Sequence, residues 1–297
     1  MSDNKNKGCV LALGYFDSVH VGHRAVIAKA KEISDKKRLK TVVFTFDGNL
    51  RAQILGEKLK CIYLPSERKT ILEKLNVDSV YFAPVTKEFL SLTKQEFLDN
   101  VKRNFNVSVF VCGRDYRFGK FAEGDVDYLK EYASNNGLEV LIVNDVNMDG
   151  QKVSTTRIRR LLEDGEIKKA NALLETPFFI TGEVVRDRGV GKKMNYPTVN
   201  VKIDGQKQMP KEGVYKGKVE IDQERYEAVI NHGRRPTFDL EQVVTEAHII
   251  NFNRDVYGKR IKVIFEDYLR KPKKFSSIEE LKDQLGKDVK SVELAND

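Results

Sequence analysis

Apolar residues in the first half of the chain follow two alternating spacings. The continuous apolar run Cys9–Leu13 is typical of a strand buried on both faces of a parallel sheet. Val26, Ala30 and Ile33 then recur at the spacing of one helix face. Strands separated by helices predict an α/β domain with a parallel sheet and crossover helices. Further strands are expected at Thr41–Phe46, Val107–Cys112 and Leu138–Val143, and further helices around Phe97–Phe105 and Val126–Ala133.

A different pattern begins near Pro177. From there to Phe265, short segments alternate apolar and polar residues and are separated by Gly, Pro and Asn. This pattern predicts a mainly antiparallel sheet or small β-barrel. The expected strands are Phe178–Val185, Val214–Ile221, Tyr226–Ile230, Val244–Ile250 and Ile261–Phe265.

Capping-box patterns mark two helix starts. Thr93 with Glu96, and Ser277 with Glu280, each stand ahead of apolar residues at helical spacing. The second of these helices closes the chain. The domain boundary is placed after a helix that carries Ile167, Ala170 and Leu174. The predicted domains are residues 1–176 and residues 177–297.

The composition is that of a globular protein, with 40% hydrophobic and 32% charged residues among 297. No segment approaches the roughly 18 apolar residues that a membrane helix needs, so we expect a cytoplasmic protein without a membrane partner. The three cysteines lie in apolar runs and are interpreted as small buried hydrophobic residues. The net charge of +8 suits nucleic acid or phosphorylated small ligands. Basic and acidic residues are interleaved, which favours a solvated surface, and no nucleic-acid partner is expected.

The first candidate site follows the first predicted strand. Its sequence is Gly14-Tyr15-Phe16-Asp17-Ser18-Val19-His20-Val21-Gly22-His23, directly before a helix. Helix N-termini bind anions, two imidazoles can reach a triphosphate, and Gly22 allows close approach to the backbone. Two alternatives stay open at this point: a strand–turn–helix with surface histidines, and a zinc site of the His-x-x-His type.

Two later segments favour phosphate binding. The run Val153-Ser154-Thr155-Thr156-Arg157-Ile158-Arg159 opens another helix, where hydroxyls cap free N–H groups or bind phosphate and the two arginines add charge. The run Gly113-Arg114-Asp115-Tyr116-Arg117-Phe118-Gly119 follows a predicted strand. Ligand sites of open parallel sheets form at the carboxyl ends of strands.

The order of these motifs resembles the nucleotidylyltransferase superfamily, and their fuller forms resemble its FAD synthetase branch. The resemblance implies a Rossmann-like domain in which the phosphate of FMN attacks the α-phosphorus of ATP. It implies that His20 and His23 stabilise the transition state. It further implies that Gly14, Phe16, Asp17, Gly22, Ser154, Thr155, Arg157 and Arg159 bind ATP or phosphate, and that Asp115 and Phe118 contact flavin or nucleotide. The family usually has Pro-His-Pro where this chain has Gly48-Asn49-Leu50.

The second half holds the other candidate site. Pro197-Thr198-Val199-Asn200 precedes, by forty-odd residues, Glu246-Ala247-His248 on an alternating strand. Each motif alone is weak, because Pro-Thr-x-Asn is often a turn and a strand glutamate usually faces solvent. Glu246, however, shares its face with Val244, His248 and Ile250, so we expect it on the core side, where a carboxylate needs a partner or a function. No P-loop or protein-kinase motif is present in the sequence.

The second half resembles the riboflavin kinase family. The matching segments are Pro197–Asn200, Gly213–Tyr215, Gly233–Phe238, Glu246–His248, Tyr257-Gly258, Leu269-Arg270 and Lys274-Phe275. The resemblance implies a six-stranded antiparallel barrel with a C-terminal helix, and Mg²⁺ as cofactor. Thr198 and Asn200 would engage Mg²⁺ and phosphate, Gly191 and Lys192 would bind ATP, and Glu246 would be the general base for riboflavin.

The combined resemblance implies a bifunctional enzyme that acts on riboflavin, FMN and ATP. Because of Gly48-Asn49-Leu50, a riboflavin kinase with a degenerate N-terminal module stays open as an alternative. So do a flavin- or RNA-binding regulatory protein and a nucleotidylyltransferase with another acceptor. The sequence also leaves a homo-oligomer open.

Overall fold

A computed structural model of the chain describes residues 8–50, 52, 59–186, 196–234 and 243–294. By their internal contacts the residues divide into two compact units, Met1–Thr155 and Thr156–Asp297.

The first unit is built on a parallel sheet with the strand order β3-β2-β1-β4-β5. Its strands are β1 (Cys9–Leu13), β2 (Lys40–Phe46), β3 (Ser79–Ala83), β4 (Val107–Gly113) and β5 (Glu139–Val143). Its helices are α1 (Val21–Lys37), α3 (Pro65–Glu73), α4 (Lys87–Leu90), α5 (Lys94–Phe105), the 3₁₀ helix η1 (Lys120–Ala122) and α6 (Val126–Asn135). A short ribbon of β6 (Asn147–Met148) and β7 (Gln151–Lys152) completes it.

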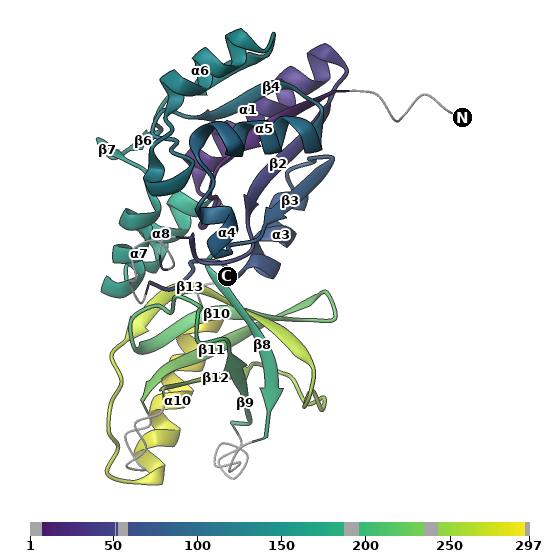
Figure 1. The fold of residues 1–297 in the computed structure, drawn as a ribbon. Helices are drawn as coiled ribbons and strands as arrows, with labels where there is room; N and C mark the ends of the chain where they lie inside the picture. The colour runs from purple at the N-terminus through teal and green to yellow at the C-terminus, as the bar shows by residue number, and fades with distance from the viewer. Residues whose placement is uncertain (1–7, 51, 53–58, 187–195, 235–242, 295–297) are drawn as a thin grey trace. The chain divides into compact units, whose positions relative to one another are not determined.

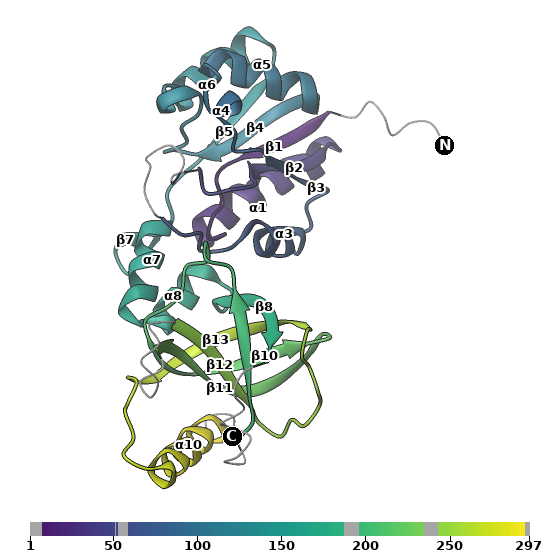
Figure 2. The same cartoon turned by 60° about the horizontal axis from the view of Figure 1, so that its bottom comes forward.

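Helices cover both faces of this sheet. Figure 2 shows α5 and α6 on one face and α1 and α3 on the other. The residues of β1 therefore alternate between two apolar layers, and all five are buried. Leu11 and Phe44 pack in the layer of α5, while Ile27 and Ala30 of α1 are buried against the opposite face. The predicted parallel sheet with crossover helices is confirmed.

The second unit contains a closed six-stranded barrel with the order β10-β11-β12-β9-β8-β13, all of whose strand pairs are antiparallel (Figure 1). The strands are β8 (Phe179–Val185), β9 (Thr198–Ile203), β10 (Gly213–Ile221), β11 (Glu224–Arg234), β12 (Val243–Ile249) and β13 (Arg260–Arg270). The helices are α7 (Thr155–Asp164), α8 (Ile167–Leu174) and α10 (Ile278–Glu293). The predicted barrel and closing helix are confirmed.

The two predicted capping boxes differ in detail. At α5, Thr93 Oγ1 accepts from the N–H of Glu96, and the Glu96 carboxylate accepts from the N–H of Thr93. At α10, Ser277 Oγ accepts from the N–H of Glu280, but the Glu280 carboxylate binds the N–H of Ser276 instead. Both helices begin where the sequence predicts.

Internal contacts place α8 with the barrel. Asn171 on α8 donates from Nδ2 to the carbonyl of Phe265 at 2.9 Å, and its Oδ1 accepts from the N–H of Phe178 at 2.7 Å. Lys168 pairs with Asp267 at 2.7 Å. The division of the chain by internal contacts lies between Thr155 and Thr156 in the sequence, and a domain boundary between residues 176 and 177 stays a prediction.

The three cysteines are buried and free, as the sequence predicts. Burial raises the pKa of the Cys9 and Cys112 thiols to about 12, so both are neutral near pH 7. Among the described residues, no helix is both long and apolar enough to cross a membrane.

Candidate active sites

The turn between β1 and α1 brings the two histidines of the first motif together. His20 is the N-cap of α1, and its Nδ1 accepts a hydrogen bond of 3.2 Å from the N–H of His23. The two rings stack with centroids 3.7 Å apart and planes inclined by 16°. Because Nδ1 of His20 is an acceptor, the proton of the neutral imidazole resides on Nε2, which is then a donor.

Burial keeps both imidazoles neutral. It lowers the pKa of His20 to about 4, and it lowers the pKa of His23 well below the usual value, with His20 and Arg68 adding to the effect. His23 Nδ1 is buried without a hydrogen-bond partner in the described structure. The pair can therefore offer N–H donors to a phosphoryl group without carrying a fixed charge of its own.

The same turn contains strained backbone. Phe16 and Val19 have φ values of 49° and 44°, which is unusual for an aromatic and a β-branched residue. The Phe16 ring is buried and lies so close to Gly14 that a Cβ atom there would be 2.6 Å from Cζ. At Gly22, a Cβ atom would lie 3.0 Å from Cε1 of His20. Phe16, Gly14 and Gly22 thus shape the turn; their contact with ATP stays a prediction.

Asp17 and Ser18 connect this turn to distant segments. The buried Asp17 carboxylate accepts from the N–H of Ile62 at 3.1 Å, and its carbonyl accepts from the N–H of Tyr63 at 3.3 Å. Ser18 Oγ lies 2.9 Å from Thr155 Oγ1 at the start of α7. The structure therefore brings the histidine turn and the predicted hydroxyl-rich helix start together.

The other predicted residues of that helix start have different surroundings. Ser154 immediately precedes α7, and Arg157 and Arg159 lie in its first two turns. Arg159 Nη1 donates to Gln208 Oε1 at 2.8 Å. Binding of phosphate by Ser154, Thr155, Arg157 and Arg159 stays a prediction.

Asp115 and Phe118 differ in accessibility. Asp115 has a largely exposed side chain and pairs with Lys152 at 2.8 Å, and Lys152 also pairs with Asp145 at 2.8 Å. Phe118 is only 6% exposed and packs against Phe97 with centroids 5.4 Å apart. Its ring belongs to the core of the sheet domain, so its observed contacts are structural, and its role in ligand binding stays a prediction.

Lys152 is a residue that the sequence reasoning missed. It lies close enough to His20 for its charge to lower the pKa of that imidazole, while Asp115 acts in the opposite direction. A lysine two residues before the hydroxyl-rich helix start was the available signal. Lys152 places a positive charge near the turn, and its ammonium group is paired with the carboxylates of Asp115 and Asp145.

Asn49 has a structural role in the segment where the family usually has Pro-His-Pro. Its Oδ1 accepts from the N–H of Ala52 at 3.0 Å and from the Tyr15 hydroxyl at 3.4 Å, and its Nδ2 donates to the carbonyl of Leu59. The Tyr15 hydroxyl also lies 3.3 Å from the Gly48 carbonyl. These contacts join the segment to the turn that carries the histidines.

In the barrel, strand register gathers the second set of candidate residues. Glu246 on β12 is paired with Asn200 on β9, and His248 is paired with Thr198. On its other side Glu246 is paired with Asn231 of β11. A carboxylate, a hydroxyl and two amides therefore come from three adjacent strands. Gly191 and Lys192 lie outside the described residues.

Glu246 was expected on the core side of its strand, but its side chain does not face the interior of the barrel. Thr245, Ala247 and Ile249 are the buried residues of β12, while Glu246 and His248 are half-buried on the opposite face. This face is the outer wall of the barrel. Part of it packs under α10, where Val214, Val229, Ile250 and Val292 form a small apolar cluster. Alternation in the sequence predicts which residues of β12 share a face. It does not predict whether that face lies inside or outside the barrel, because α10 buries part of the outer face as well.

The helix α10 is held to this wall by an ion pair. Arg270 on β13 donates from Nη2 and Nε to Asp288 on α10, with 2.7 Å for the shortest distance. Asp288 is 4% exposed, so the pair is largely withdrawn from water. Elsewhere on the wall, the rings of Tyr196 and His248 make an edge-to-face contact with centroids 5.2 Å apart. Arg270 lies in a segment that matches the riboflavin kinase family, and its observed partner gives it a structural role.

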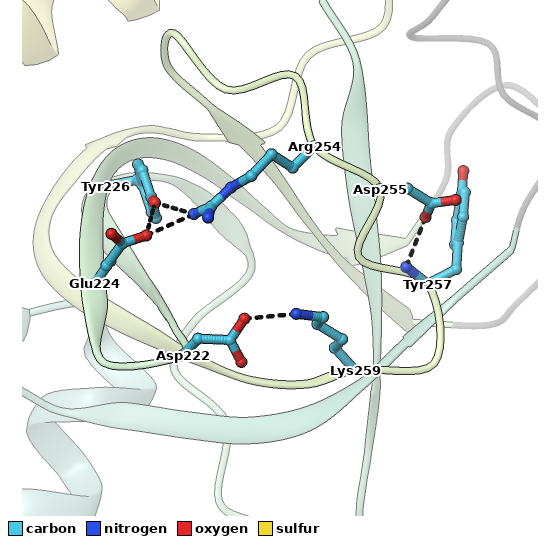
Figure 3. Close-up of polar contacts among 7 residues, drawn as sticks. All are labelled: Asp222, Glu224, Tyr226, Arg254, Asp255, Tyr257 and Lys259. Atoms are coloured by element: carbon cyan, nitrogen blue, oxygen red, sulfur yellow. Dashed lines mark hydrogen bonds and ion pairs between the residues drawn. The ribbon is translucent and has the colours of Figure 1, made fainter.

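Figure 3 shows polar contacts between the turn that joins β10 to β11 and the loop that precedes β13. Arg254 pairs with Glu224 at 2.7 Å and Lys259 pairs with Asp222, while the N–H of Tyr257 donates to Asp255 at 3.0 Å. These groups are exposed or nearly so. The Tyr257-Gly258 match of the sequence thus lies in a loop that is fixed by local polar contacts.

Comparison with known proteins identifies relatives of both halves. Residues 2–157 match the family model of FAD synthetase, and residues 174–295 match that of riboflavin kinase. A "Bifunctional riboflavin kinase/FMN adenylyltransferase" of Listeria monocytogenes is 36% identical, over 94% of this chain and 90% of that protein. One of Bacillus subtilis with the same name is 34% identical, over 94% and 90%.

A solved structure has the same fold over nearly the whole chain. It belongs to a Streptococcus pneumoniae protein described as a macrolide-efflux protein, with a TM-score of 0.88 and 34% sequence identity. The alignment covers 97% of this chain and 95% of that one.

Proposed function

The chain belongs to the family of bifunctional riboflavin kinases/FMN adenylyltransferases, and on that premise we propose where and how its two reactions occur. The chain is a riboflavin kinase and an FMN adenylyltransferase, which makes FMN from riboflavin and FAD from FMN with ATP. We assign adenylyl transfer to the histidine turn of the sheet domain, and phosphoryl transfer to the outer wall of the barrel around Glu246.

Adenylyl transfer needs little covalent chemistry from the protein. An oxygen of the FMN phosphate attacks the α-phosphorus of ATP, the bond from that phosphorus to the bridging oxygen breaks, and pyrophosphate leaves. The protein positions the two phosphates and stabilises the charge that develops on the α-phosphoryl oxygens. The Nε2–H of neutral His20 is a suitable donor, and His23 stacks beside it.

The observation that carries this assignment is the contact of 2.9 Å between Ser18 Oγ and Thr155 Oγ1. It joins the histidine turn to Thr155 at the start of α7, and the N-terminus of a helix favours bound anions. Lys152 adds a cation next to His20. Donors and positive charge therefore converge at the carboxyl edge of the sheet, where parallel sheets form their ligand sites.

Phosphoryl transfer requires that the 5′-hydroxyl of riboflavin lose a proton as it attacks the γ-phosphorus of ATP, with ADP as leaving group. Glu246 is the proposed base, since its half-buried carboxylate lies across the ladder from Asn200. Thr198 and Asn200 supply hard oxygen donors, which would fit Mg²⁺ together with substrate phosphates. When bound, Mg²⁺ offsets negative charge on the transferring phosphoryl group.

The test is chromatography of the flavins formed from riboflavin, ATP and Mg²⁺ by the purified chain. FMN should appear first and FAD later. A reaction that stops at FMN, even when FMN is supplied, would favour a kinase with an inactive N-terminal module. Failure to form either product would contradict the proposal as a whole.

A further inference from the structure

Arg68 is a fully buried arginine at the edge of the sheet domain. It lies on α3 with 0% of its surface exposed. Its Nη1 donates to the carbonyl of Tyr15 at 2.8 Å and to Thr45 Oγ1 at 3.4 Å. Its Nη2 donates to the carbonyl of Phe46 at 2.6 Å. The guanidinium therefore bridges the end of β2 and the turn that follows β1.

The hydrogen-bond partners of this guanidinium are all neutral. Within the described ranges no ion pair includes Arg68, and its buried Nε has no hydrogen-bond partner. The rings of Tyr15 and Phe82 lie 5.2 and 5.7 Å from its central carbon. Its neighbour Glu67 directs a carboxylate oxygen to the N–H of Leu64 at the start of the helix.

An unpaired buried charge is expensive for a fold. The cost of withdrawing one charge from water, even after the protein relaxes, is comparable to a large part of the net stability of a domain. Hydrogen bonds to carbonyls and contacts with ring faces offset part of it, but neutral partners do not cancel the charge. A methionine or leucine would fill similar space at lower electrostatic cost. A purely structural role therefore explains the hydrogen bonds of Arg68 better than it explains its charge.

The position of Arg68 suggests what the charge is for. Tyr15, whose carbonyl it binds, lies five residues before His20 in the turn that we assign to adenylyl transfer. Thr45 Oγ1 donates to the same carbonyl at 2.6 Å, so this carbonyl is held from two sides. The charge of Arg68 also reaches His23, where it contributes to the lowered pKa after burial and His20.

We propose that Arg68 is a positioning residue of the adenylyl-transfer site. Its hydrogen bonds fix the histidine turn, and its buried positive charge, which no carboxylate of the described residues neutralises, attracts the phosphates of ATP through space. This inference rests on the proposed function of that turn. It goes further by assigning a role to a residue outside both sequence motifs. Arg68 touches no substrate in this account and acts through the turn and through its field.

Three variants separate the two contributions of Arg68. Arg68→Lys keeps the charge and loses the planar fork, whereas Arg68→Met keeps the length of the side chain and loses the charge. Lys69→Met removes one positive charge from the exposed neighbouring position of the same helix and is the matched control. Each full-length variant is assayed for FAD formation from FMN, for FMN formation from riboflavin, and for the rise in melting temperature caused by ATP.

The wild type must form FAD from FMN, since failure here would defeat the proposed function rather than this inference. Arg68→Met should raise KM for ATP in FAD formation by about 10-fold, because the field of one buried positive charge no longer attracts the phosphates of ATP. Its ATP-induced rise in melting temperature should shrink. Arg68→Lys should keep KM for ATP within a few-fold, with a lower kcat because the turn is held less firmly. Lys69→Met should match the wild type.

The proposal fails if Arg68→Met and Arg68→Lys have the same KM for ATP, because the charge would then be irrelevant. It also fails if Arg68→Met only lowers the melting temperature while KM, kcat and the ATP-induced shift are unchanged. FMN formation by the barrel verifies that each variant protein is otherwise intact. If Arg68→Met does not fold, Arg68→Lys and the glutamine variant Arg68→Gln provide the same comparison of charge.

Discussion

The two candidate sites are constructed in different ways. The histidine turn depends on buried groups, positive φ angles at Phe16 and Val19, and contacts between segments far apart in sequence. The kinase site depends on strand register, which sets Glu246 beside Asn200 on a half-buried wall. In the first site the chemistry and the fold share the same residues. In the second, the side chains proposed to act are separate from those that fill the barrel.

This difference predicts how the sites respond to substitution. Changes in the turn should alter both catalysis and stability, because its side chains are buried. Changes on the barrel wall should alter catalysis and leave stability almost unchanged, because Glu246 is half-buried and projects away from the interior. The following experiments test that distinction.

The largest effect is expected from Glu246→Gln. Loss of a general base should lower FMN formation by about 10²–10⁴-fold. FAD formation from supplied FMN and the melting temperature should stay within error of the wild type. Glu183→Gln, which changes an exposed glutamate of β8, is the control. Equal loss of both reactions in Glu246→Gln would contradict separate sites.

The next largest effect is expected from replacing His20 and His23 together by alanine. FAD formation should fall by about 10²–10³-fold or more, as for loss of a donor that stabilises a transition state. FMN formation from riboflavin should continue. In contrast to Glu246→Gln, the variant should also melt at a lower temperature, because two stacked rings are removed, of which that of His20 is buried. Unchanged FAD formation would sink the assignment of the turn.

The ion pair between Arg270 and Asp288 tests the attachment of α10 to the barrel wall. Asp288→Ala leaves a partly buried guanidinium unpaired and should lower the free energy of unfolding by roughly 3 kcal/mol. Urea unfolding of the whole chain measures this. Arg254→Met is the control, because its pair with Glu224 is exposed to solvent and should contribute little to stability (Figure 3). Equal effects of the two changes would show that α10 is not held by this pair.

A smaller effect is expected from pH. The pKa of His20 is lowered to about 4 in the folded state, below an unfolded value near 6.5, so the unfolded chain binds more protons between these values. Stability should therefore be fully present above pH 6.5 and fall as the pH drops toward 4. Protonation of His20 should lower the free energy of unfolding at pH 5 by about 2 kcal/mol relative to pH 7.

Urea unfolding at pH 7 and pH 5 measures that dependence. His20→Gln should reduce the difference between the two pH values, since glutamine does not titrate. If the variant and the wild type lose the same stability between pH 7 and pH 5, the imidazole of His20 is not held neutral by burial. Adenylyl transfer itself should not show protonation of His20 until the pH is well below 6.

Much of the fold could be predicted because it follows from local patterns. The continuous apolar run Cys9–Leu13 indicates a strand buried on both faces, and the alternating segments of the second half indicate strands buried on one face. The Thr93 capping box indicates where a helix begins. The site was harder. Sequence motifs identified His20 and Glu246, but the orientation of Glu246 required knowing that α10 covers the outside of the barrel.

Other features left no readable pattern. Arg68 is an ordinary basic residue in a helix that carries both acidic and basic side chains, and only the fold shows that it is buried near the ends of two strands. Phe118 was predicted to contact a ligand, yet its ring packs in the core against Phe97. Long-range contacts of this kind depend on the arrangement of several segments, and no spacing within one segment reports them.

Mixing two variants tests the independence of the two sites most directly. Glu246→Gln and the double variant of His20 and His23 are combined in one solution with riboflavin, ATP and Mg²⁺, and the flavins are separated over time. Because the double variant should release FMN and Glu246→Gln should adenylylate it, the mixture is predicted to form FAD although neither protein does so alone. A mixture that accumulates no FAD, while each variant is folded, would contradict two self-sufficient sites in one chain.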